Sequence, residues 1–363
     1  MKKSIALILT MVMAVSLLAG CTGTTVVVGE CTCPQMETME PVTVPAATGE
    51  SLILDSAVKT GLAVSTNISE SKSAAADAVG EAKYDVTLAA VAVNDAGVIT
   101  SCMIDSIPAT VAFDVNGVIT SDITAAVKTK NEQGADYGMV AYGNAVAEWD
   151  QQVAAVAAYA VGKTVEELKN GDIDMTTGKA KDGTDLQSMA TIFLGGYVAA
   201  IEAAVNNAQH RGAQAGDQLV LATMPTVKSS TSATADAAGN AQLDADITVL
   251  TRANGVITSC YIDSVQAKIA FDTTGTITTD LSAPVMTKNE LGDGYNMVAW
   301  GGAKAEWYQQ AASFAQYVTN KTADEVAGIA ITDTTKPADG SDLATSVTIA
   351  IGGFQALIAK AMQ

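Results

Sequence analysis

Short apolar runs separated by polar turns dominate the sequence after residue 80. Residues 84–93 are rich in apolar side chains with a partial alternation, and a second run follows at 98–104. The turn between them, at 94–97, reads Asn-Asp-Ala-Gly, which predicts a β-hairpin. Residues 109–113 and 118–120 flank another polar turn and predict a second hairpin.

The apolar spacing changes from strand-like to helical beyond a glycine-containing loop at 134–138. Residues 144–161 predict a helix, because one face would carry Ala145, Trp149, Val153, Val156 and Tyr159. Thr164 and Glu167 are spaced as a capping box at the start of a short helix. After a polar loop, residues 191–208 predict the last helix. Hairpins followed by helices predict an α+β fold of antiparallel hairpins packed against helices.

This whole pattern occurs twice along the chain. Residues 97–106 recur as 255–264 with Tyr261 in place of Met103, and Thr-Lys-Asn-Glu at 129–132 recurs at 287–290. Further matches are Met-Val-Ala at 139–141 and 297–299, Ala-Glu-Trp at 147–149 and 305–307, and Lys-Thr at 163–164 and 321–322. A repeat this long predicts domain duplication and not a solenoid. We therefore expect two tandem domains at 51–208 and 217–363, joined by a linker at 209–216.

The first twenty residues have the pattern of a targeting segment. Lys2 and Lys3 precede an apolar run at 4–18 that is short for a membrane span. Leu18-Ala19-Gly20-Cys21 resembles the lipobox of bacterial lipoproteins, which implies removal of residues 1–20 and lipidation of Cys21. A buried N-terminal helix is the disfavoured alternative. No later segment is apolar enough to span a bilayer, so lipid is the expected anchor.

Residues 21–50 predict a lipidated, flexible tether of Thr, Val, Pro and Glu. Cys31 and Cys33 within it could form a redox dithiol or help to bind a soft metal. A pair of ordinary tether thiols is favoured, since no His or further Cys lies nearby. Cys102 and Cys260 fall in strand-like runs, where buried apolar thiols are expected.

Charge and residue content exclude several classes of function. The net charge of −19 disfavours binding to nucleic acid and to anionic lipid headgroups. His210 is the only histidine and falls in the predicted linker, where a solvated residue is the expected role. Without further histidines, histidine-based acid–base catalysis and His-rich metal sites are excluded. The chain also has no nucleophile elbow and no phosphate-binding Walker loop, so ordinary hydrolytic enzymes are poorly supported.

One seven-residue motif occurs in both halves, at the predicted start of the last helix. Asp185, Ser188 and Thr191 mark the first copy, and Asp342, Thr345 and Thr348 mark the second. One interpretation is structural, with the Asp or the Ser/Thr of each copy capping the last helix. The other is that the helix N-terminus binds a phosphate, which the last threonine carries as an ester.

The motif resembles the Asp-x-x-[Ser/Thr]-Gly-Ala-[Thr/Ser] signature of FMN-binding domains. At this signature a flavin transferase attaches FMN to the threonine through the phosphate. Asp185, Ser188, Ala190 and Thr191 match, with Met189 in place of the glycine. In the second copy Asp342, Thr345 and Thr348 match, while Ser346 and Val347 replace the Gly-Ala pair. The resemblance implies up to two covalent FMN groups, with Thr191 the firmer attachment site.

The full chain resembles the two-domain flavinylated lipoproteins of Gram-positive extracellular electron transfer, the peptide-pheromone-encoding lipoprotein A type. The resemblance favours an electron carrier over a turnover enzyme and implies a lipid anchor at the extracellular face of the cell membrane. It implies a membrane quinone/NADH dehydrogenase system as donor and extracellular acceptors such as ferric iron. The alternative is a non-redox surface-binding or structural lipoprotein with duplicated domains.

Several aromatic and basic side chains are candidates to contact a bound flavin. Tyr137, Met139, Tyr295 and Met297 are candidates for the ring, with core packing about equally expected. For Trp149 and Trp307 core packing is favoured, because they lie on a helical apolar face. Lys130 and Lys288 could neutralise phosphate or reduced flavin, or could be solvated loop lysines.

Overall fold

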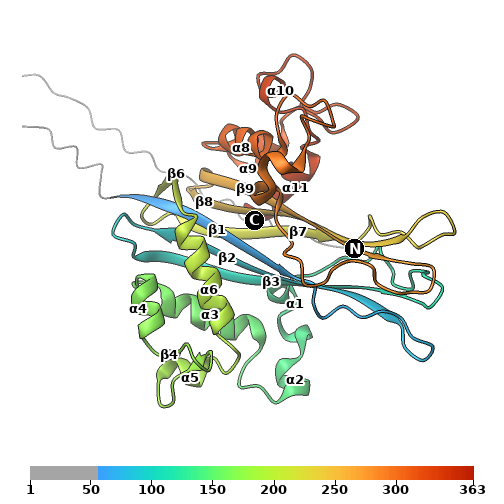
Figure 1. Cartoon of the computed structure of the whole chain (residues 1–363). Helices are drawn as coiled ribbons and strands as arrows, with labels where there is room; N and C mark the ends of the chain where they lie inside the picture. Colours follow the sequence, from blue (N-terminus) through green and yellow to red (C-terminus); the bar gives the residue numbers. More distant parts are fainter. Residues whose placement is uncertain (1–55) are drawn as a thin grey trace, which may run out of the picture. The chain divides into compact units, whose positions relative to one another are not determined.

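The computed structural model describes residues 56–363 (Figure 1). The predicted signal segment, Cys21, the tether and its thiols Cys31 and Cys33 lie outside the described residues. Residues 51–363 belong to one compact unit. Within its described part, no helix combines the length and apolar character needed to cross a bilayer.

The first sheet is antiparallel and has the strand order β3-β2-β1-β6. Its strands are β1 (Ala57–Asn67), β2 (Gly80–Val93), β3 (Ile99–Phe113) and β6 (Gln209–Gln214). The first predicted hairpin is thus present, and both of its strands are longer than expected. The second predicted hairpin is present in reduced form. Residues 109–113 are the end of β3, and the chain turns at 114–117, where the Asp114 amide donates to the Val118 carbonyl. The return segment pairs with β3 only through an isolated antiparallel bridge between Phe113 and Ile119. The strands expected separately at 98–104 and 109–113 are parts of this one strand, and between them the buried Asp105 carboxylate accepts the Ser106 amide.

The second sheet consists of β7 (Gln218–Thr226), β8 (Gly239–Ala253) and β9 (Val256–Phe271), also antiparallel. Residues 209–214, predicted as part of a linker, form β6 and pair with β1 of the first sheet. His210 is exposed there, and its Nε2 lies 3.0 Å from Asp95 Oδ1. The chain therefore passes between the halves as a strand, because β1 offers unpaired backbone groups at that edge.

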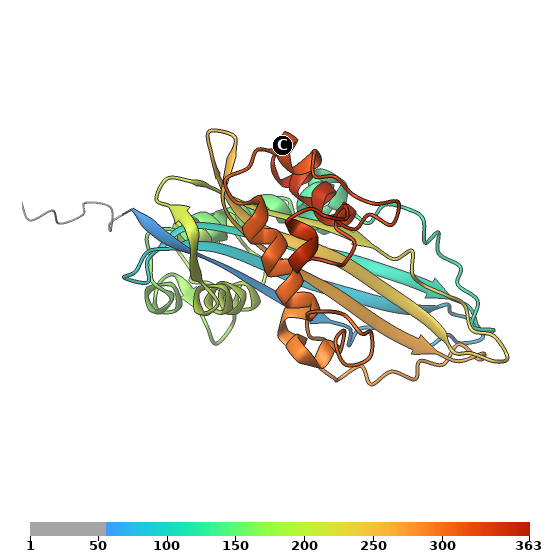
Figure 2. The same cartoon turned by 90° about the horizontal axis from the view of Figure 1, so that it is seen from above.

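The two sheets share one hydrophobic core (Figure 2). Phe113 from β3 and Phe271 from β9 stack with ring centroids 4.1 Å apart. The Tyr84 hydroxyl, buried on β2, donates to the Ala241 carbonyl of β8 at 2.8 Å. Backbone hydrogen bonds also join the two halves. The Ala74 amide of the first half donates to the Gly275 carbonyl of the second, and the Ala233 amide of the second half donates to the Gly117 carbonyl of the first. Each half therefore completes the core of the other.

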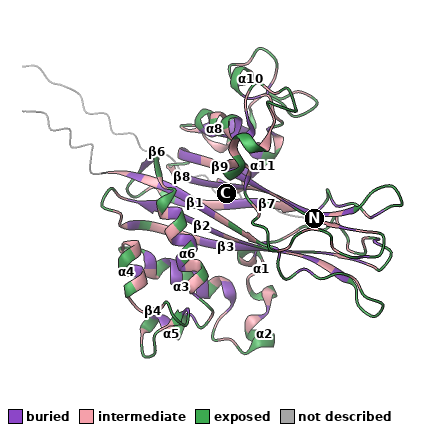
Figure 3. Cartoon of the chain, viewed as in Figure 1, coloured by how far each residue is buried: buried purple, intermediate pink, exposed green. Residues whose placement is uncertain are grey.

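Helices cover the outer face of each sheet, and two further buried clusters lie beneath them (Figures 1 and 3). The first half carries α1 (Lys130–Gln133), η1 (Gly134–Tyr137), α2 (Met139–Gly143), α3 (Trp149–Ala160), α4 (Val165–Asn170), the short strands β4 (Ile173–Asp174) and β5 (Lys179–Ala180), α5 (Asp185–Met189) and α6 (Gly195–Asn206). The second half carries α7 (Lys288–Leu291), η2 (Gly292–Tyr295), α8 (Trp307–Val318), α9 (Ala323–Ala327), α10 (Leu343–Ser346) and α11 (Gly352–Ala361). Antiparallel sheets packed against helices confirm the predicted α+β class.

The predicted helix boundaries needed correction at two places. The helix expected at 144–161 begins only at Trp149, because Glu148 and Gln151 form a capping box that fixes its start. The helix expected at 191–208 begins at Gly195, and Thr191 precedes it in an irregular connection. The short helix after Thr164 is present as predicted, with the Thr164–Glu167 capping box formed.

Candidate functional site

The start of α3 anchors two separate segments of the first half. The buried Glu148 carboxylate accepts the backbone amides of Met139 at 2.8 Å and Val140 at 3.1 Å. One turn later, the fully buried Gln152 accepts the amides of Thr191 at 2.8 Å and Ile192 at 3.2 Å. Positions four apart lie on one face of a helix, so α3 holds both segments side by side.

Gln152 fixes the candidate attachment threonine directly. Its Oε1 atom lies 3.4 Å from the Thr191 hydroxyl, while its Nε2 donates to the Ala147 carbonyl at 2.8 Å. Thr191 itself is exposed, so its hydroxyl can be reached from solvent. A buried amide that holds the backbone of an exposed threonine gives that hydroxyl a defined position without covering it.

The second half repeats this arrangement around Thr348. Gln310 in α8 is buried, and its Oε1 accepts the Thr348 amide at 2.7 Å, the Ile349 amide at 3.1 Å and the Thr348 hydroxyl at 3.1 Å. Glu306 accepts the Met297 amide at 2.8 Å, as Glu148 accepts that of Met139. Thr348 is half-buried, and therefore less open than Thr191.

The motif residues do not cap the last helix, so this structural interpretation is wrong. Asp185 and Ser188 belong to their own short helix α5, whose N-cap is Thr184. In the copy, Asp342 stands at the N-cap position of α10 but makes no side-chain capping bond, and Thr345 lies inside that helix. Ala190 and Leu194 are buried in the cluster beneath the helices, and the chain between them is irregular.

The expectation that the threonines sit at a free helix N-terminus is also wrong. The amides of Thr191 and Thr348 are taken by the buried glutamines. The last helices start further on, where the Leu194 amide donates to the Gly178 carbonyl and the Ile351 amide to that of Thr335. Any phosphate on these threonines would therefore rely on side chains more than on a helix end.

The four other motif residues face solvent. The Ser188 hydroxyl donates to the Asp185 carbonyl at 2.7 Å, and the Thr345 hydroxyl to the Asp342 carbonyl at 2.7 Å. All four residues are exposed, so their side chains, including the two carboxylates, form an accessible surface beside each threonine.

Thr191 borders a cavity of about 550 Å³. This volume lies within the roughly 300–1,000 Å³ of small-molecule sites. Besides Thr191 its lining is Asp174, Thr177, Lys179, Ala180, Lys181, Asp182, Gln187 and Ala190. Lys179 and Lys181 line the same cavity as Thr191 and could pair with an ester phosphate there. The Lys181 ammonium donates to the Gly171 carbonyl, and the carboxylates of Asp174 and Asp182 also face the cavity. In the second half the sequence repeat keeps one of these lysines, as Lys336, and has Ala338 in place of Lys181.

Tyr137 and Met139 both pack, half-buried, against the cluster that contains Trp149 and Ala190. Tyr295 and Met297 pack in the same way against the cluster of Trp307 and Val347. Trp149 is 3 % and Trp307 6 % exposed, in agreement with core packing. The Tyr and Met candidates thus pack on the buried cluster of each half, and neither Tyr137 nor Met139 lines the cavity beside Thr191.

Lys130 and Lys288 lie over aromatic rings. The Lys130 ammonium is 5.2 Å from the ring centroids of both Tyr137 and Trp149, and its nearest carboxylate oxygen, on Asp85, is 3.8 Å away. Lys288 is 5.2 Å from the Tyr295 ring and 5.0 Å from that of Trp307. Cation–π contacts of this kind bind each lysine to the core, so neither is a freely solvated loop residue.

The two halves differ in the aromatic residue that contacts the buried tryptophan. The Trp149 indole Nε1 donates to the Tyr197 hydroxyl at 3.0 Å, and burial raises the pKa of Tyr197. Phe354 takes the equivalent place beside Trp307, with ring centroids 5.9 Å apart, and carries no hydroxyl. The first site is therefore the more polar of the two at this point.

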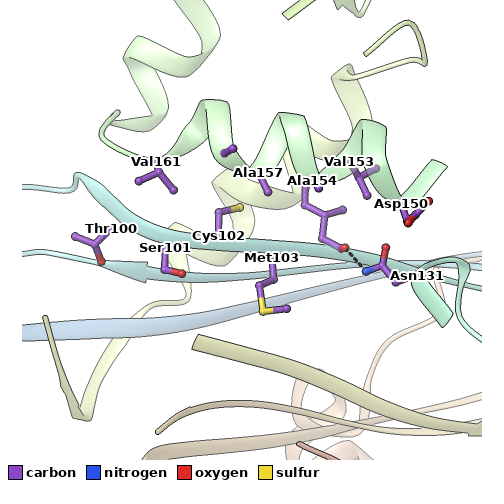
Figure 4. Close-up of a pocket in the computed structure, with 12 residues that line it drawn as sticks. Thr100, Ser101, Cys102, Met103, Asn131, Asp150, Val153, Ala154, Ala157 and Val161 are labelled. Atoms are coloured by element: carbon purple, nitrogen blue, oxygen red, sulfur yellow. Dashed lines mark hydrogen bonds between the residues drawn. The ribbon is translucent and has the colours of Figure 1, made fainter. Parts of the chain in front are cut away.

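A second groove lies between β3 and α3 (Figure 4). Cys102 and Met103 line it from the strand, and Ala154, Ala157 and Val161 line it from the helix. Burial raises the pKa of the Cys102 thiol to about 12, and that of Cys260 also to about 12. Both thiols therefore stay protonated at neutral pH. Cys260 is buried as predicted, whereas Cys102 is half-buried at the groove.

Sequence reasoning missed the residues that hold the site. Gln152 and Gln310 were not singled out, although Glu-Trp-x-Gln-Gln is repeated at 148–152 and 306–310. Lys179 and Lys336, also repeated, were overlooked in the polar loop. Identical polar residues at matched positions of the repeat were the available signal.

No family model matches this sequence, and no curated protein or solved structure shows significant similarity to it. Among residues 56–363 no group of three or more His, Cys, Asp or Glu side chains is placed to hold a metal ion.

Proposed function

We propose that this protein is a membrane-anchored extracellular flavoprotein that carries electrons through FMN bound covalently to Thr191 and Thr348. The observation that carries the proposal is the doubled motif, in which each acceptor threonine is held by a buried glutamine. The two sets of contacts match in partner and in atom, at 2.8 Å for Thr191 and 2.7 Å for Thr348. In this proposal the two halves are tandem FMN-binding-type domains that arose by duplication.

The residues of the first site have separate tasks. Gln152 fixes the backbone of Thr191, so that the hydroxyl oxygen points to one place when the phosphoester forms. In that step the oxygen would attack the flavin-bearing phosphorus of a flavin dinucleotide held by the transferase, the pyrophosphate bond would break, and a nucleoside monophosphate and the hydroxyl proton would leave. Lys179 and Lys181 border the same cavity and would balance the phosphate charge. Bound FMN would supply the redox chemistry, while the chain supplies attachment, orientation and local electrostatics.

Covalent attachment suits a protein outside the membrane. A freely bound cofactor would be lost by diffusion, whereas an ester keeps it at high effective concentration. The lipobox at 18–21 and the tether that follows would hold the domains near the membrane surface. Electrons would come from a membrane quinone/NADH dehydrogenase system and pass to extracellular acceptors such as ferric iron.

The proposal is tested by co-expression with a flavin transferase and export of the product. Denaturing gel electrophoresis followed by flavin fluorescence reports covalent attachment without relying on any activity. We expect a fluorescent band at the mass of the chain, and no such band when the transferase is left out. A folded protein that stays without fluorescence in the presence of an active transferase contradicts the proposal and favours a non-redox surface lipoprotein.

A further inference from the structure

We infer that Tyr142 and Trp300 are the aromatic faces on which the two flavin rings stack. This inference rests on the proposed function. Both residues are large aromatic side chains left in solvent, with exposed fractions of 91 % and 88 %. They occupy matched positions of the sequence repeat, three residues after Met139 and Met297 respectively. Two such exposures at matched positions are unusual for a structural role, since large apolar side chains are mostly buried.

The start of α3 anchors both the helix that carries Tyr142 and the segment that carries Thr191. Glu148 binds the first two amides of α2, the helix that carries Tyr142. Gln152, four residues on, binds the amide of Thr191. The two anchor positions on α3 are therefore only about 6 Å apart along the helix, and the inference places the flavin ring between the two segments that they hold.

The aromatic residues are held in place on a short, pinned segment. The Tyr142 amide donates to the Gly138 carbonyl at 3.0 Å, and the Trp300 amide to the Asn296 carbonyl at 3.1 Å. Gly138 has a φ of 78°, and a Cβ atom there would lie 2.6 Å from the Tyr142 ring. The ring thus rests against the glycine with its other side free. Asn296, at the matched position, also adopts a left-handed conformation.

A flavin ring tethered through its phosphate needs an aromatic or apolar face to have a defined orientation. Tyr and Trp provide flat faces with little side-chain entropy to lose, and offset stacking is the favoured geometry. Trp149 and Trp307 cannot take this role, because both are buried under the helices. Tyr142 and Trp300 would therefore orient the rings outward, at the surface where an electron acceptor arrives.

The test uses protein loaded at one site at a time. In Thr348→Ala protein only the Thr191 flavin remains, and Tyr142→Ala should raise its fluorescence because stacking on an aromatic side chain quenches flavin emission. The interaction free energy typical of an aromatic pair predicts a roughly two- to tenfold increase in the population of unstacked flavin rings. In Thr191→Ala protein Trp300→Ala should have the same effect on the remaining flavin, and Trp300→Phe should largely preserve the quenching.

The control combines each aromatic variant with the flavin of the other half. Trp300→Ala should leave the Thr191 flavin unchanged, and Tyr142→Ala should leave the Thr348 flavin unchanged. Flavin content is measured by intact mass in every sample. A fully loaded protein whose fluorescence and flavin circular dichroism do not respond to either aromatic variant overturns the inference alone. Absence of any adduct on folded protein overturns the proposed function together with it.

Discussion

The side-chain oxygen of Gln152 accepts the backbone amide of Thr191 at 2.8 Å, although the two residues are 39 positions apart in the chain. The same atom also accepts the Ile192 amide. Gln310 makes the matching contacts with Thr348 and Ile349 in the second half. Both glutamines are buried, so their amides serve the threonine segments and not solvent.

The first prediction concerns the stability of this anchor. Gln310→Ala removes the acceptor of two backbone amides and one hydroxyl. Loss of a buried acceptor costs about 1–3 kcal/mol in the free energy of unfolding. Gln316→Ala, an exposed position of the same helix, should change it by less than about 0.5 kcal/mol. Denaturant unfolding of both variants measures the difference, and equal stabilities would show that Gln310 is not an anchor.

The same variant should affect modification. Without Gln310 the Thr348 hydroxyl loses its fixed position, so flavin transfer to this threonine should fall while transfer to Thr191 continues. Gln152→Ala should have the reverse effect. Peptide mapping after co-expression with the transferase reports each site separately. Unchanged occupancy at both threonines in both variants would mean that the transferase remodels the loop for itself.

Asp263 should contribute to the pH dependence of the free energy of unfolding. Burial raises the pKa of this carboxyl from 3.8 to about 6 in the folded protein. Between about pH 4 and 6 the folded state therefore holds a proton that the unfolded chain has released, and the free energy of unfolding falls as pH rises. The shift corresponds to up to about 3 kcal/mol, fully lost above pH 6.

The Asp263→Asn variant removes this contribution, because asparagine carries no titratable group. The asparagine side-chain oxygen can still accept the Ser264 and Asn289 amides, so the two backbone contacts of the carboxylate are retained. We expect the variant to be more stable than the parent protein at pH 7 and to differ from it least near pH 4. Exposed aspartates with lowered pKa values, such as Asp114 and Asp272, act in both proteins and cancel in the difference. A difference that is constant with pH would be inconsistent with a titrating Asp263.

The lipid anchor is tested by Cys21→Ala. This change removes the thiol to which lipid would be attached and leaves the folded residues 56–363 untouched. The variant should lose its membrane association in cell fractionation while its thermal unfolding stays the same. Normal amounts of the variant in the membrane fraction would show that something other than Cys21 holds the protein there.

Local patterns were sufficient for much of the fold. Asn-Asp-Ala-Gly at 94–97 predicted the first hairpin, and the Thr164–Glu167 capping box predicted its helix, because both depend on neighbours in sequence. The shared core could not be predicted in the same way, since Phe113 and Phe271 meet only through the packing of two sheets. The assignment of 209–216 as a linker overlooked β6 for the same reason, because its partner is β1.

In the candidate site, too, local sequence patterns were predictable and tertiary contacts were not. The motif residues and the threonines were identified from the repeat alone, but their positions were assigned to a helix start that does not exist there. What holds Thr191 in place is a glutamine from another helix and the burial of Ala190 and Leu194. These are tertiary contacts, and only the repetition of Gln152 as Gln310 recorded them in the sequence.

The central claim is tested most directly by the intact mass of the exported protein and of its threonine variants after co-expression with a flavin transferase. We predict that the parent chain gains the mass of two FMN groups, each less one water. Thr191→Ala and Thr348→Ala should each lose one adduct, and the double variant should carry none. An unmodified mass for the folded parent chain, or an adduct that persists in the double variant, would contradict the assignment of these threonines as flavin attachment sites.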